Sequence, residues 1–399
     1  MKVTVVTPIF PILAQPYRGH AVYKIVLALS KRADVDVICP FPRYPKWFQP
    51  SYDHRPPDLS FSPPGVLTRY LEYPALPGFT RCVNGLVCAK YLEPYFRKCP
   101  PDVACNFWLY PEGFATVVVA RKLGIPSVVG SIGSDLNRIA DPASRWLTRL
   151  AMKRATFVVT KSEHLRQRAI QMGISASKVR TIRNGCDANV FRMGDRSAAR
   201  AQLAINDKDE FVLFVGRLDD KKGIFELLEA VASLASHRPN LRLAYVGDGP
   251  GGELLRNKTK HLALEQRIFF PGPCSSQKVA EWLAAANVLA LPSYNEGNPN
   301  VVIEALSCGR PVIATDVGGI PELVSASSGI LIASRDSHAL AAAIDTAMER
   351  NWDERSISEQ FHRGWDDAAG ELLGLCELAI RQRFEKCPPP AKAAPVLSH

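Results

Sequence analysis

The stretch Tyr294-Asn-Glu-Gly-Asn-Pro-Asn-Val-Val-Ile-Glu-Ala-Leu-Ser-Cys-Gly-Arg-Pro-Val-Ile-Ala-Thr315 carries most of the information on the fold. The apolar run Val288-Leu-Ala-Leu291 precedes it and predicts a buried strand. A helical pattern begins at Val301 and ends at Gly309, and an apolar run from Pro311 predicts the next strand. Strand, polar loop, helix and strand in this order indicate a parallel β-α-β unit.

Two glutamates in this stretch lie eight positions apart, Glu296 in the loop and Glu304 in the helix. Loop amides and a helix N-terminus can receive the anionic part of a ligand. A carboxylate at each end suits a sugar that flanks a phosphate. The stretch therefore predicts a sugar-phosphate site.

The composition indicates a globular protein. The chain has 399 residues, 47% of them hydrophobic, which favours two or three domains. No apolar run approaches the ~20 residues of a membrane-spanning helix, and the N-terminus lacks the pattern of a signal peptide. The ten cysteines are scattered without a Cys-x-x-Cys pair, which favours reduced thiols. We therefore expect a cytoplasmic protein.

Basic residues concentrate in the first half. Residues 1–190 hold 26 Lys and Arg against 12 Asp and Glu, a net charge of +14, whereas residues 191–399 hold 23 against 27. An anionic partner is expected: phosphates, lipid head groups or nucleic acid. The amphipathic helix predicted at residues 145–154 is basic and suits an anionic membrane surface. A core helix with a solvated basic face is the alternative.

The first half opens with a predicted strand, helix and strand, the start of a doubly wound parallel sheet. Gly19, between that strand and helix, allows close backbone approach to a ligand, and a plain turn explains it equally well. Residues 40–80 are rich in Pro and aromatic side chains and are expected to form an irregular excursion. Residues 130–135, a Gly/Ser loop ending at Asp135, follow a later strand, where ligands of such sheets bind.

The parallel pattern restarts after a boundary near residues 192–196. Arg217 and Lys222 lie five positions apart in a loop after the next strand and can clamp a diphosphate. A solvated basic turn is the competing interpretation. A formal G-x-G-x-x-G begins at Gly247, but Pro250 stiffens it and the next strand ends without an acidic residue. We interpret it as a tight turn.

Several motifs together resemble one known family. In the second half they are Arg217 with Lys222, Val246-Gly-Asp-Gly-Pro250, Pro271-Gly-Pro273, Glu296-Gly-Asn-Pro-Asn-Val-Val-Ile-Glu304 and Pro311-Val-Ile-Ala-Thr-Asp-Val-Gly-Gly-Ile-Pro-Glu322. In the first half they are Leu109-Tyr-Pro-Glu-Gly113, Gly133-Ser-Asp135 and Arg183-Asn-Gly-Cys-Asp187. The chain resembles the retaining glycosyltransferases of family 4 over nearly its whole length.

The resemblance implies the GT-B architecture, an α/β fold with two Rossmann-like parallel-sheet domains facing a central cleft. Residues 1–190 would form an acceptor-binding domain, joined by a C-terminal helix at 365–383 that crosses back to it. Residues 200–362 would form the nucleotide-sugar donor domain. Residues 386–399 are expected to be a disordered tail.

The resemblance also implies roles for single residues. Arg217 and Lys222 would hold the donor diphosphate and stabilise its charge as it leaves, and Glu296 would contact the transferred sugar at the reaction centre. Glu304 would bind the ribose. Further substrate contacts would come from Gly19, Asp135, Asn184, Gly297, Asn298, Pro299, Asn300 and Val301. The implied mechanism is front-face departure with retention, without a cofactor or metal ion.

One departure from the family concerns histidine. Many members carry a His in the loop at residues 130–135 and often near Cys105 and Phe107, and this chain has none there. Asp135 or Glu112 is the hypothetical replacement.

We therefore expect transfer of a sugar from a nucleotide-diphosphate sugar to a lipid-linked or polysaccharide acceptor. Surface polysaccharide or glycolipid assembly at the inner face of a membrane is the expected setting. The alternatives are a nucleotide-sugar hydrolase or epimerase of the same fold, or a non-catalytic nucleotide-sugar binding protein. A nucleic-acid binder fits the basic half but not the paired carboxylates.

Overall fold

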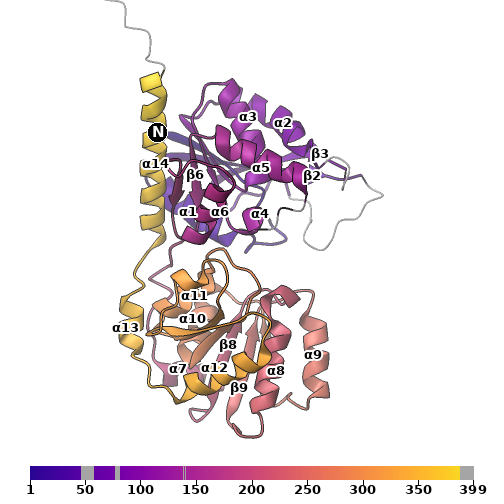
Figure 1. Ribbon diagram of the computed structural model, residues 1–399, viewed down its shortest axis with the longest axis vertical. Coiled ribbons are helices and arrows are strands. Elements are labelled where there is room, and N and C mark those ends of the chain that lie inside the picture. Colours follow the sequence, from indigo (N-terminus) through magenta and orange to yellow (C-terminus); the bar gives the residue numbers. More distant parts are fainter. Residues whose placement is uncertain (46–57, 77–80, 138, 140, 387–399) are drawn as a thin grey trace, which may run out of the picture. The chain divides into compact units, whose positions relative to one another are not determined.

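The computed structural model describes residues 1–45, 58–76, 81–137, 139 and 141–386. The chain divides into two compact units (Figure 1). The first contains Met1–Thr160, Arg166–Ile182 and the chain from Ala369, and the second contains Lys161–Leu165 and Arg183–Ala368. The expected tail at 387–399 lies outside the described residues.

The first unit is built on a parallel sheet of seven strands in the order β3-β2-β1-β4-β5-β6-β7. Its strands are β1 (Lys2–Val6), β2 (Asp34–Arg43), β3 (Leu67–Pro74), β4 (Val103–Phe107), β5 (Ser127–Gly130), β6 (Phe157–Thr160) and β7 (Val179–Thr181). The central strands are buried and mostly apolar, because both faces of a parallel sheet are covered. Val5 of β1, for example, lies between Val37 and Cys105 of the neighbouring strands and has no exposed surface.

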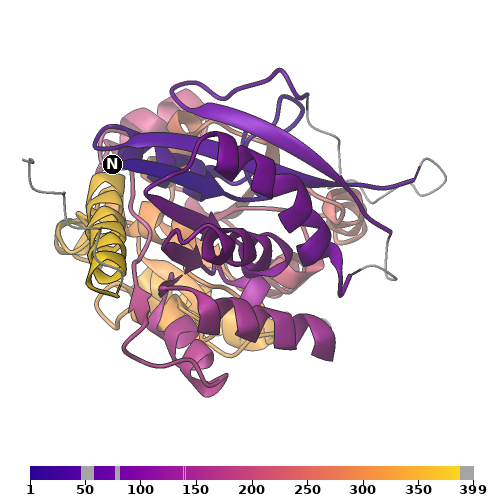
Figure 2. The ribbon, with the colours of Figure 1, turned by 90° about the horizontal axis from the view of Figure 1, so that it is seen from above.

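Helices cover this sheet. They are α1 (His20–Ser30), α2 (Asn84–Lys98), the turn η1 (Leu109–Gly113), α3 (Phe114–Lys122), α4 (Ser134–Asn137), α5 (Pro142–Arg154), α6 (Glu163–Gln171) and α14 (Trp365–Lys386). From Ala369 on, α14 belongs to this unit, where Cys376 Sγ lies 3.4 Å from Cys105 Sγ of β4. Figure 2 shows this unit from above, with α14 in yellow.

The expected irregular excursion at residues 40–80 is wrong where the structure describes it. Strand β2 continues to Arg43, and Leu67–Pro74 forms an eight-residue edge strand paired with it. The physical reason is alternation in the first half of the strand, because Thr68 and Tyr70 are buried while Leu67 and Arg69 are exposed. Leu71 and Tyr73 are buried as well, on the other face of the strand. An edge strand also tolerates proline.

The second unit repeats the architecture with six parallel strands in the order β10-β9-β8-β11-β12-β13. The strands are β8 (Glu210–Val215), β9 (Leu241–Val246), β10 (Ile268–Gly272), β11 (Val288–Leu291), β12 (Val312–Thr315) and β13 (Gly329–Ile332). The helices and turns are α7 (Arg196–Leu203), η2 (Asp220–Lys222), α8 (Ile224–Leu234), α9 (Gly252–His261), α10 (Ser276–Ala285), α11 (Asn300–Ser307), η3 (Ile320–Glu322), α12 (Ser337–Glu349) and α13 (Glu354–Glu359).

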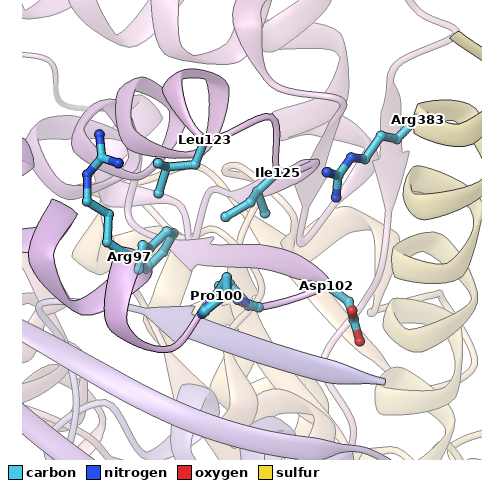
Figure 3. Close-up of a pocket in the computed structure, with 8 residues that line it drawn as sticks. Arg97, Pro100, Asp102, Leu123, Ile125 and Arg383 are labelled. Atoms are coloured by element: carbon cyan, nitrogen blue, oxygen red, sulfur yellow. The ribbon is translucent and has the colours of Figure 1, made fainter. Parts of the chain in front are cut away.

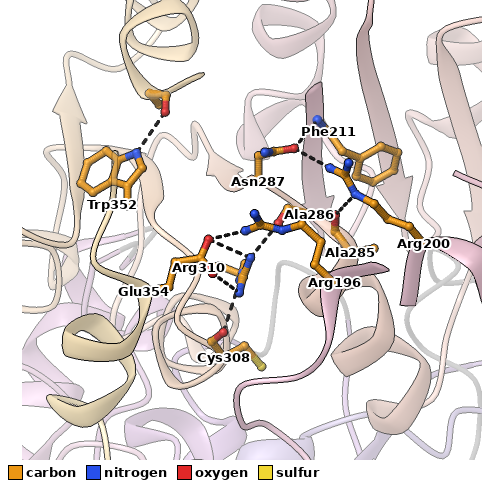
Figure 4. A network of polar contacts seen from close by, with 11 residues as sticks. Arg196, Arg200, Phe211, Ala285, Ala286, Asn287, Cys308, Arg310, Trp352 and Glu354 are labelled. Atoms are coloured by element: carbon orange, nitrogen blue, oxygen red, sulfur yellow. Dashed lines mark hydrogen bonds and ion pairs between the residues drawn. The ribbon is translucent and has the colours of Figure 1, made fainter. Parts of the chain in front are cut away.

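A buried ionic network holds α7, α13 and the start of β12 together (Figure 4). Arg310 is 1% exposed. Its guanidinium donates to both carboxylate oxygens of Glu354, at 2.7 and 3.1 Å, and to the carbonyl oxygen of Ala286 at 3.2 Å. Arg196 pairs with the same carboxylate. Burial lowers the pKa of Arg310 to about 10, against the attraction of Glu354 that raises it.

Each sheet reverses its strand order at one point, between β1 and β4 in the first unit and between β8 and β11 in the second. Doubly wound sheets bind ligands beyond the carboxyl ends of the strands at this switch point. The loops after β8 and β11 carry Arg217, Lys222 and Glu296. The fold therefore places these residues where a ligand is expected.

Candidate functional site

The loops after β8 and β11 bring two of the predicted catalytic residues into contact. Lys222 Nζ lies 2.5 Å from Glu296 Oε1, and their side chains are 31% and 11% exposed. Arg217, at the start of the first loop, is more open, with its side chain 45% exposed and its Nε 3.8 Å from Asp219 Oδ2. The site thus presents two cations and one carboxylate.

Gly223 makes the close approach of these loops possible. It has φ 68°, which favours glycine, and a Cβ there would lie 2.1 Å from the carbonyl oxygen of Pro292. The N–H of Tyr294 donates to the carbonyl oxygen of Lys221 at 2.9 Å. Lys222 is therefore held against the backbone that leads to Glu296.

The glycines from Gly247 onward pack against the same region. A Cβ at Gly247 would lie 1.9 Å from the carbonyl oxygen of Gly216, and one at Gly249 would lie 2.4 Å from that of Leu218. The N–H of Leu218 donates to the carbonyl oxygen of Asp248 at 3.0 Å. This tight turn supports the backbone on both sides of Arg217.

Residues 296–300, which we call the Glu296 loop, lead into α11. Gly297 is half-buried, Asn298 is buried, and Pro299 precedes the helix without a side chain that can cap it. The first N–H groups of a helix, here those of Asn300 and Val301, have no partner within the helix and suit an anion. Glu304 is half-buried one turn further along α11.

Asn184 contacts the Glu296 loop, although 114 residues separate it from Asn298. Its N–H donates to Asn298 Oδ1 at 3.1 Å, and its Nδ2 donates to Asn300 Oδ1 at 2.7 Å. The structure thus unites five predicted residues on one loop with Lys222 and Asn184.

Gly19 and Asp135 belong to the first unit. Gly19 has φ 63°, and a Cβ there would lie 2.3 Å from the carbonyl oxygen of Ile9, so the turn itself requires glycine. The Asp135 carboxylate accepts hydrogen bonds from Ser131 Oγ and from the N–H groups of Leu109, Ile132 and Gly133, at 2.8 to 3.1 Å. Burial raises the pKa of Asp135 against these hydrogen bonds. This carboxylate orders its own loop, and its contact with a substrate stays a prediction.

Glu112 differs from Asp135. It is 2% exposed, Tyr73 donates to its Oε1 at 3.2 Å, and its Oε2 has no hydrogen-bond partner. Burial raises the pKa of Glu112 to about 8. Trp108, just before η1, has φ 144°, an unusual value for a residue other than glycine. This segment follows β4 at the switch point of the first sheet.

Comparison with known proteins decides the family. Residues 195–363 match the family described as glycosyl transferases group 1, and residues 19–185 match the glycosyl transferase 4-like domain. The chain is 30% identical over 365 residues to the putative teichuronic acid biosynthesis glycosyltransferase TuaC of Bacillus subtilis (strain 168), covering 86% of this chain and 88% of that protein. The chain belongs to the group 1 glycosyltransferases.

Two further similarities agree with this assignment. The D-inositol 3-phosphate glycosyltransferase of a Nocardioides species (strain ATCC BAA-499 / JS614) is 32% identical, with 72% of this chain and 69% of that protein covered. The solved structure of HepE from Anabaena in complex with UDP-glucose is similar with a TM-score of 0.67 at 20% identity, over 97% of this chain and 99% of that one. The glycosyltransferase thus has the expected GT-B fold class.

Glu322 of this glycosyltransferase ends one of the family motifs, but the sequence alone predicted no role for it. Its Oε2 accepts a hydrogen bond from the N–H of Glu163 at 2.9 Å, and its Oε1 accepts one from the N–H of His164 at 2.8 Å. Arg183 Nη2 lies 3.2 Å from Glu322 Oε2. The Gly-Gly-Ile-Pro-Glu motif marks this turn in the sequence. It could not reveal the role of Glu322, because the partners of its side chain lie far away in the sequence.

The basic helix expected at residues 145–154 is α5. Trp146 on it is 60% exposed, and Arg145, Arg149 and Lys153 are exposed as well. Arg149 Nε also donates to the carbonyl oxygen of Met172 at 2.6 Å, so one of the three cations has a structural contact. Within the described ranges, none of the glycosyltransferase's helices combines the length and apolarity needed to span a bilayer.

A cavity of about 400 Å³ lies at the opposite end of the first sheet (Figure 3). It is lined by Phe96, Arg97, Pro100, Pro101, Asp102, Leu123, Ile125 and Arg383. Asp102 precedes β4 and Ile125 precedes β5, so the cavity lies at the amino ends of these strands. None of the predicted site residues lines it.

Proposed function

We propose that this glycosyltransferase transfers a sugar from a nucleotide-diphosphate sugar to a lipid-linked or polysaccharide acceptor, with retention at the anomeric carbon. The contact between Lys222 and Glu296 at the switch point of the second sheet carries the proposal. One group suits the diphosphate and the other the sugar hydroxyls. The UDP-glucose complex of the similar protein HepE supports a donor of this class.

The chemistry assigns the cations to the leaving group. Cleavage of the bond between sugar and diphosphate develops negative charge on the leaving oxygen. We assign Lys222, Arg217 and the first N–H groups of α11 to that charge, because Lys222 contacts the first residue of the Glu296 loop, Arg217 precedes Lys222 in the loop after β8, and α11 begins at the end of the Glu296 loop. Departure on the front face lets the leaving phosphate help to deprotonate the acceptor hydroxyl, which yields retention.

The carboxylates would bind hydroxyl groups. We assign Glu296 to the transferred sugar, since its partner Lys222 faces the diphosphate, and Glu304 to the ribose, since it lies one turn beyond the start of α11. The proposal requires no cofactor or metal ion. Transfer by the protein after EDTA treatment should equal transfer by untreated protein, and restoration of lost activity by Mg²⁺ would contradict this part.

A screen of nucleotide sugars tests the donor. A sugar nucleotide that binds the native protein raises its melting temperature, by an amount that grows with ligand concentration. At least one of the UDP-, GDP-, ADP- and TDP-sugars tested should stabilise the protein. The sugar of that donor should appear in the product with its anomeric configuration retained, and no product with the inverted configuration should form. Stabilisation by none of them would contradict the proposal, and release of free sugar without acceptor would favour the hydrolase.

The acceptor side is proposed from the name of TuaC, which assigns that relative to teichuronic acid biosynthesis. We propose an acceptor in surface polysaccharide assembly and a peripheral location at an anionic membrane. Exposed Trp146 and the cations of α5 support the membrane partner. Sedimentation with phosphatidylglycerol vesicles should fall with salt, and Trp146→Ala with Arg145→Ala should weaken it. Salt-independent binding would contradict the electrostatic part.

A further inference from the structure

Asn184 holds both asparagine side chains of the Glu296 loop. The side-chain Oδ1 of Asn298 accepts the backbone N–H of Asn184 at 3.1 Å, and the side-chain Oδ1 of Asn300 accepts a hydrogen bond from Asn184 Nδ2 at 2.7 Å. Asn298 and Asn184 are 8% and 7% exposed, so these hydrogen bonds are largely shielded from water. The oxygens of the two loop asparagines are therefore directed at the protein and not at a ligand.

Glu322 anchors the turn that packs on the same loop. Its carboxylate accepts the N–H groups of Glu163 and His164 and pairs with Arg183, the residue before Asn184. All of these residues belong to the second unit. The Glu322 side chain thus connects its own turn to the start of α6 and to Arg183.

That turn packs directly on the loop. A Cβ at Gly318 would lie 1.8 Å from the carbonyl oxygen of Glu296, and one at Gly319 would lie 2.0 Å from that of Gly297. Gly318 also has φ 59°. Only glycine allows two backbones to approach so closely, so displacement of Glu322 must move the backbone of Glu296.

We propose that Asn184 and Glu322 are positioning residues for the donor sugar, which hold the Glu296 loop in its binding geometry. The proposal rests on the proposed function. It assigns the contacts with the sugar to the Glu296 carboxylate and to backbone N–H groups, since the asparagine oxygens are engaged. A loop ordered beforehand binds more tightly because less conformational freedom is lost on binding.

The two cations assigned to the diphosphate lie on a different loop. Lys222 and Arg217 follow β8, and that loop rests on Pro292 and on the turn after β9 rather than on Asn184 or Glu322. Loss of the two positioning residues should therefore weaken binding of the sugar portion more than binding of the nucleoside diphosphate, which keeps Lys222 and Arg217 and depends on this loop only through the first N–H groups of α11. A general loss of folding would affect both ligands.

The test compares UDP-glucose with UDP by calorimetric titration of Asn184→Ala and Glu322→Gln. If another nucleotide sugar gives the larger stabilisation in the screen, it and its own nucleoside diphosphate are the pair. We expect each variant to bind the nucleotide sugar about tenfold more weakly, the effect of one lost shielded hydrogen bond. The affinity for the nucleoside diphosphate should fall by a clearly smaller factor, about threefold or less, and kcat/KM for the donor should fall by at least tenfold.

Asn287→Ala is the matched control. Asn287 Oδ1 accepts hydrogen bonds from Arg200 Nη2 and from the N–H of Phe211, both at 2.8 Å, in the same unit. This variant should lower the melting temperature without changing the ratio of the two affinities. Rescue in Glu322→Asp, which keeps the carboxylate, should be partial.

Two results would overturn the proposal: equal weakening of both ligands in Asn184→Ala and Glu322→Gln, or no change in either. If the unmodified protein binds the nucleoside diphosphate but no nucleotide sugar, the proposed function fails as well. A selective loss of nucleotide-sugar binding supports both.

Discussion

The two units treat a buried charge in opposite ways. In the second unit, Arg310 is 1% exposed and has both oxygens of Glu354 and a backbone carbonyl as partners. In the first unit, Glu112 is 2% exposed and has one hydroxyl partner, Tyr73, while its Oε2 has none. The Arg310 guanidinium thus has partners for all of its nitrogen atoms, whereas the Glu112 carboxylate has one oxygen without a partner.

The difference indicates that the surroundings of Arg310 stabilise the fold, whereas those of Glu112 do not. A buried ion with full partners is tolerated, whereas an unpartnered buried carboxyl raises the free energy of the native state. Such groups concentrate at functional sites. Glu112 follows β4 at the switch point of its sheet, next to Trp108 with its unusual backbone. Of the two hypothetical replacements for the absent histidine, Glu112 is therefore better supported than Asp135.

The largest loss of stability is expected when the countercharge of Arg310 is removed. Glu354→Gln removes the countercharge of buried Arg310 and should lower the free energy of unfolding by about 3–5 kcal/mol. Denaturant unfolding monitored by circular dichroism measures it. Glu359→Gln, at an exposed pair with Arg355, is the control and should have little effect. Equal stability of the two variants would remove the distinction between the networks.

The ion pair between Lys222 and Glu296 at the candidate site is partly exposed, unlike Arg310 and Glu112. Lys222→Ala removes one of the two cations expected to stabilise the leaving group and should lower kcat by about 10²- to 10³-fold. Lys221→Ala, one position away with an exposed side chain, should retain activity. Sugar transfer under saturating donor measures both. Similar activity in the two variants would contradict a role in catalysis and would favour the interpretation of this loop as a solvated basic turn.

Glu112→Gln should stabilise the protein. With a pKa of about 8 in the folded state and about 4.3 when unfolded, the folded protein binds more protons between these values, so its stability falls as pH rises from 4.3 to 8. The variant loses this dependence. Its advantage should grow with pH and reach about 5 kcal/mol above pH 8, because the two pKa values differ by about 3.7.

Melting temperatures between pH 5 and 9 check this, with Glu93→Gln as the control, because Glu93 is a half-buried carboxylate that is fully paired, with Arg97 and Lys122. A pH-independent difference would show that Glu112 does not titrate as described. If Glu112 has a function, the stabilised variant should also lose activity.

Asp135→Asn should have the smallest effect, in the opposite direction. This carboxylate accepts four hydrogen bonds, and an amide can accept only on its remaining oxygen. The variant should lose about 1–3 kcal/mol of stability. Thermal unfolding of both variants should show that Asp135→Asn lowers the melting temperature and Glu112→Gln raises it, although both carboxyl groups are buried in the same unit. Melting temperatures that shift in the same direction would contradict the difference between these two carboxyl groups.

Periodicity predicted much of the fold because its signals are local. The strand, loop, helix and strand of residues 288–315 follow from apolar runs, a proline and a glycine that lie within a few residues of one another. The same rule failed for Leu67–Pro74, where prolines and aromatic side chains concealed an alternating edge strand. The roles assigned to single residues from the family resemblance stay predictions.

The sequence by itself determined two parallel sheets, the glycines at tight turns and the cations available for a diphosphate, since each depends on neighbouring residues. Only the tertiary structure decided which distant side chains meet. The sheet order sets β8 beside β11, and that neighbourhood brings Lys222 to Glu296 across 74 positions. Asn184 and Glu322 reach the Glu296 loop and its supporting turn in the same way. No local pattern encodes such pairings, because they arise from how the strands are ordered in space.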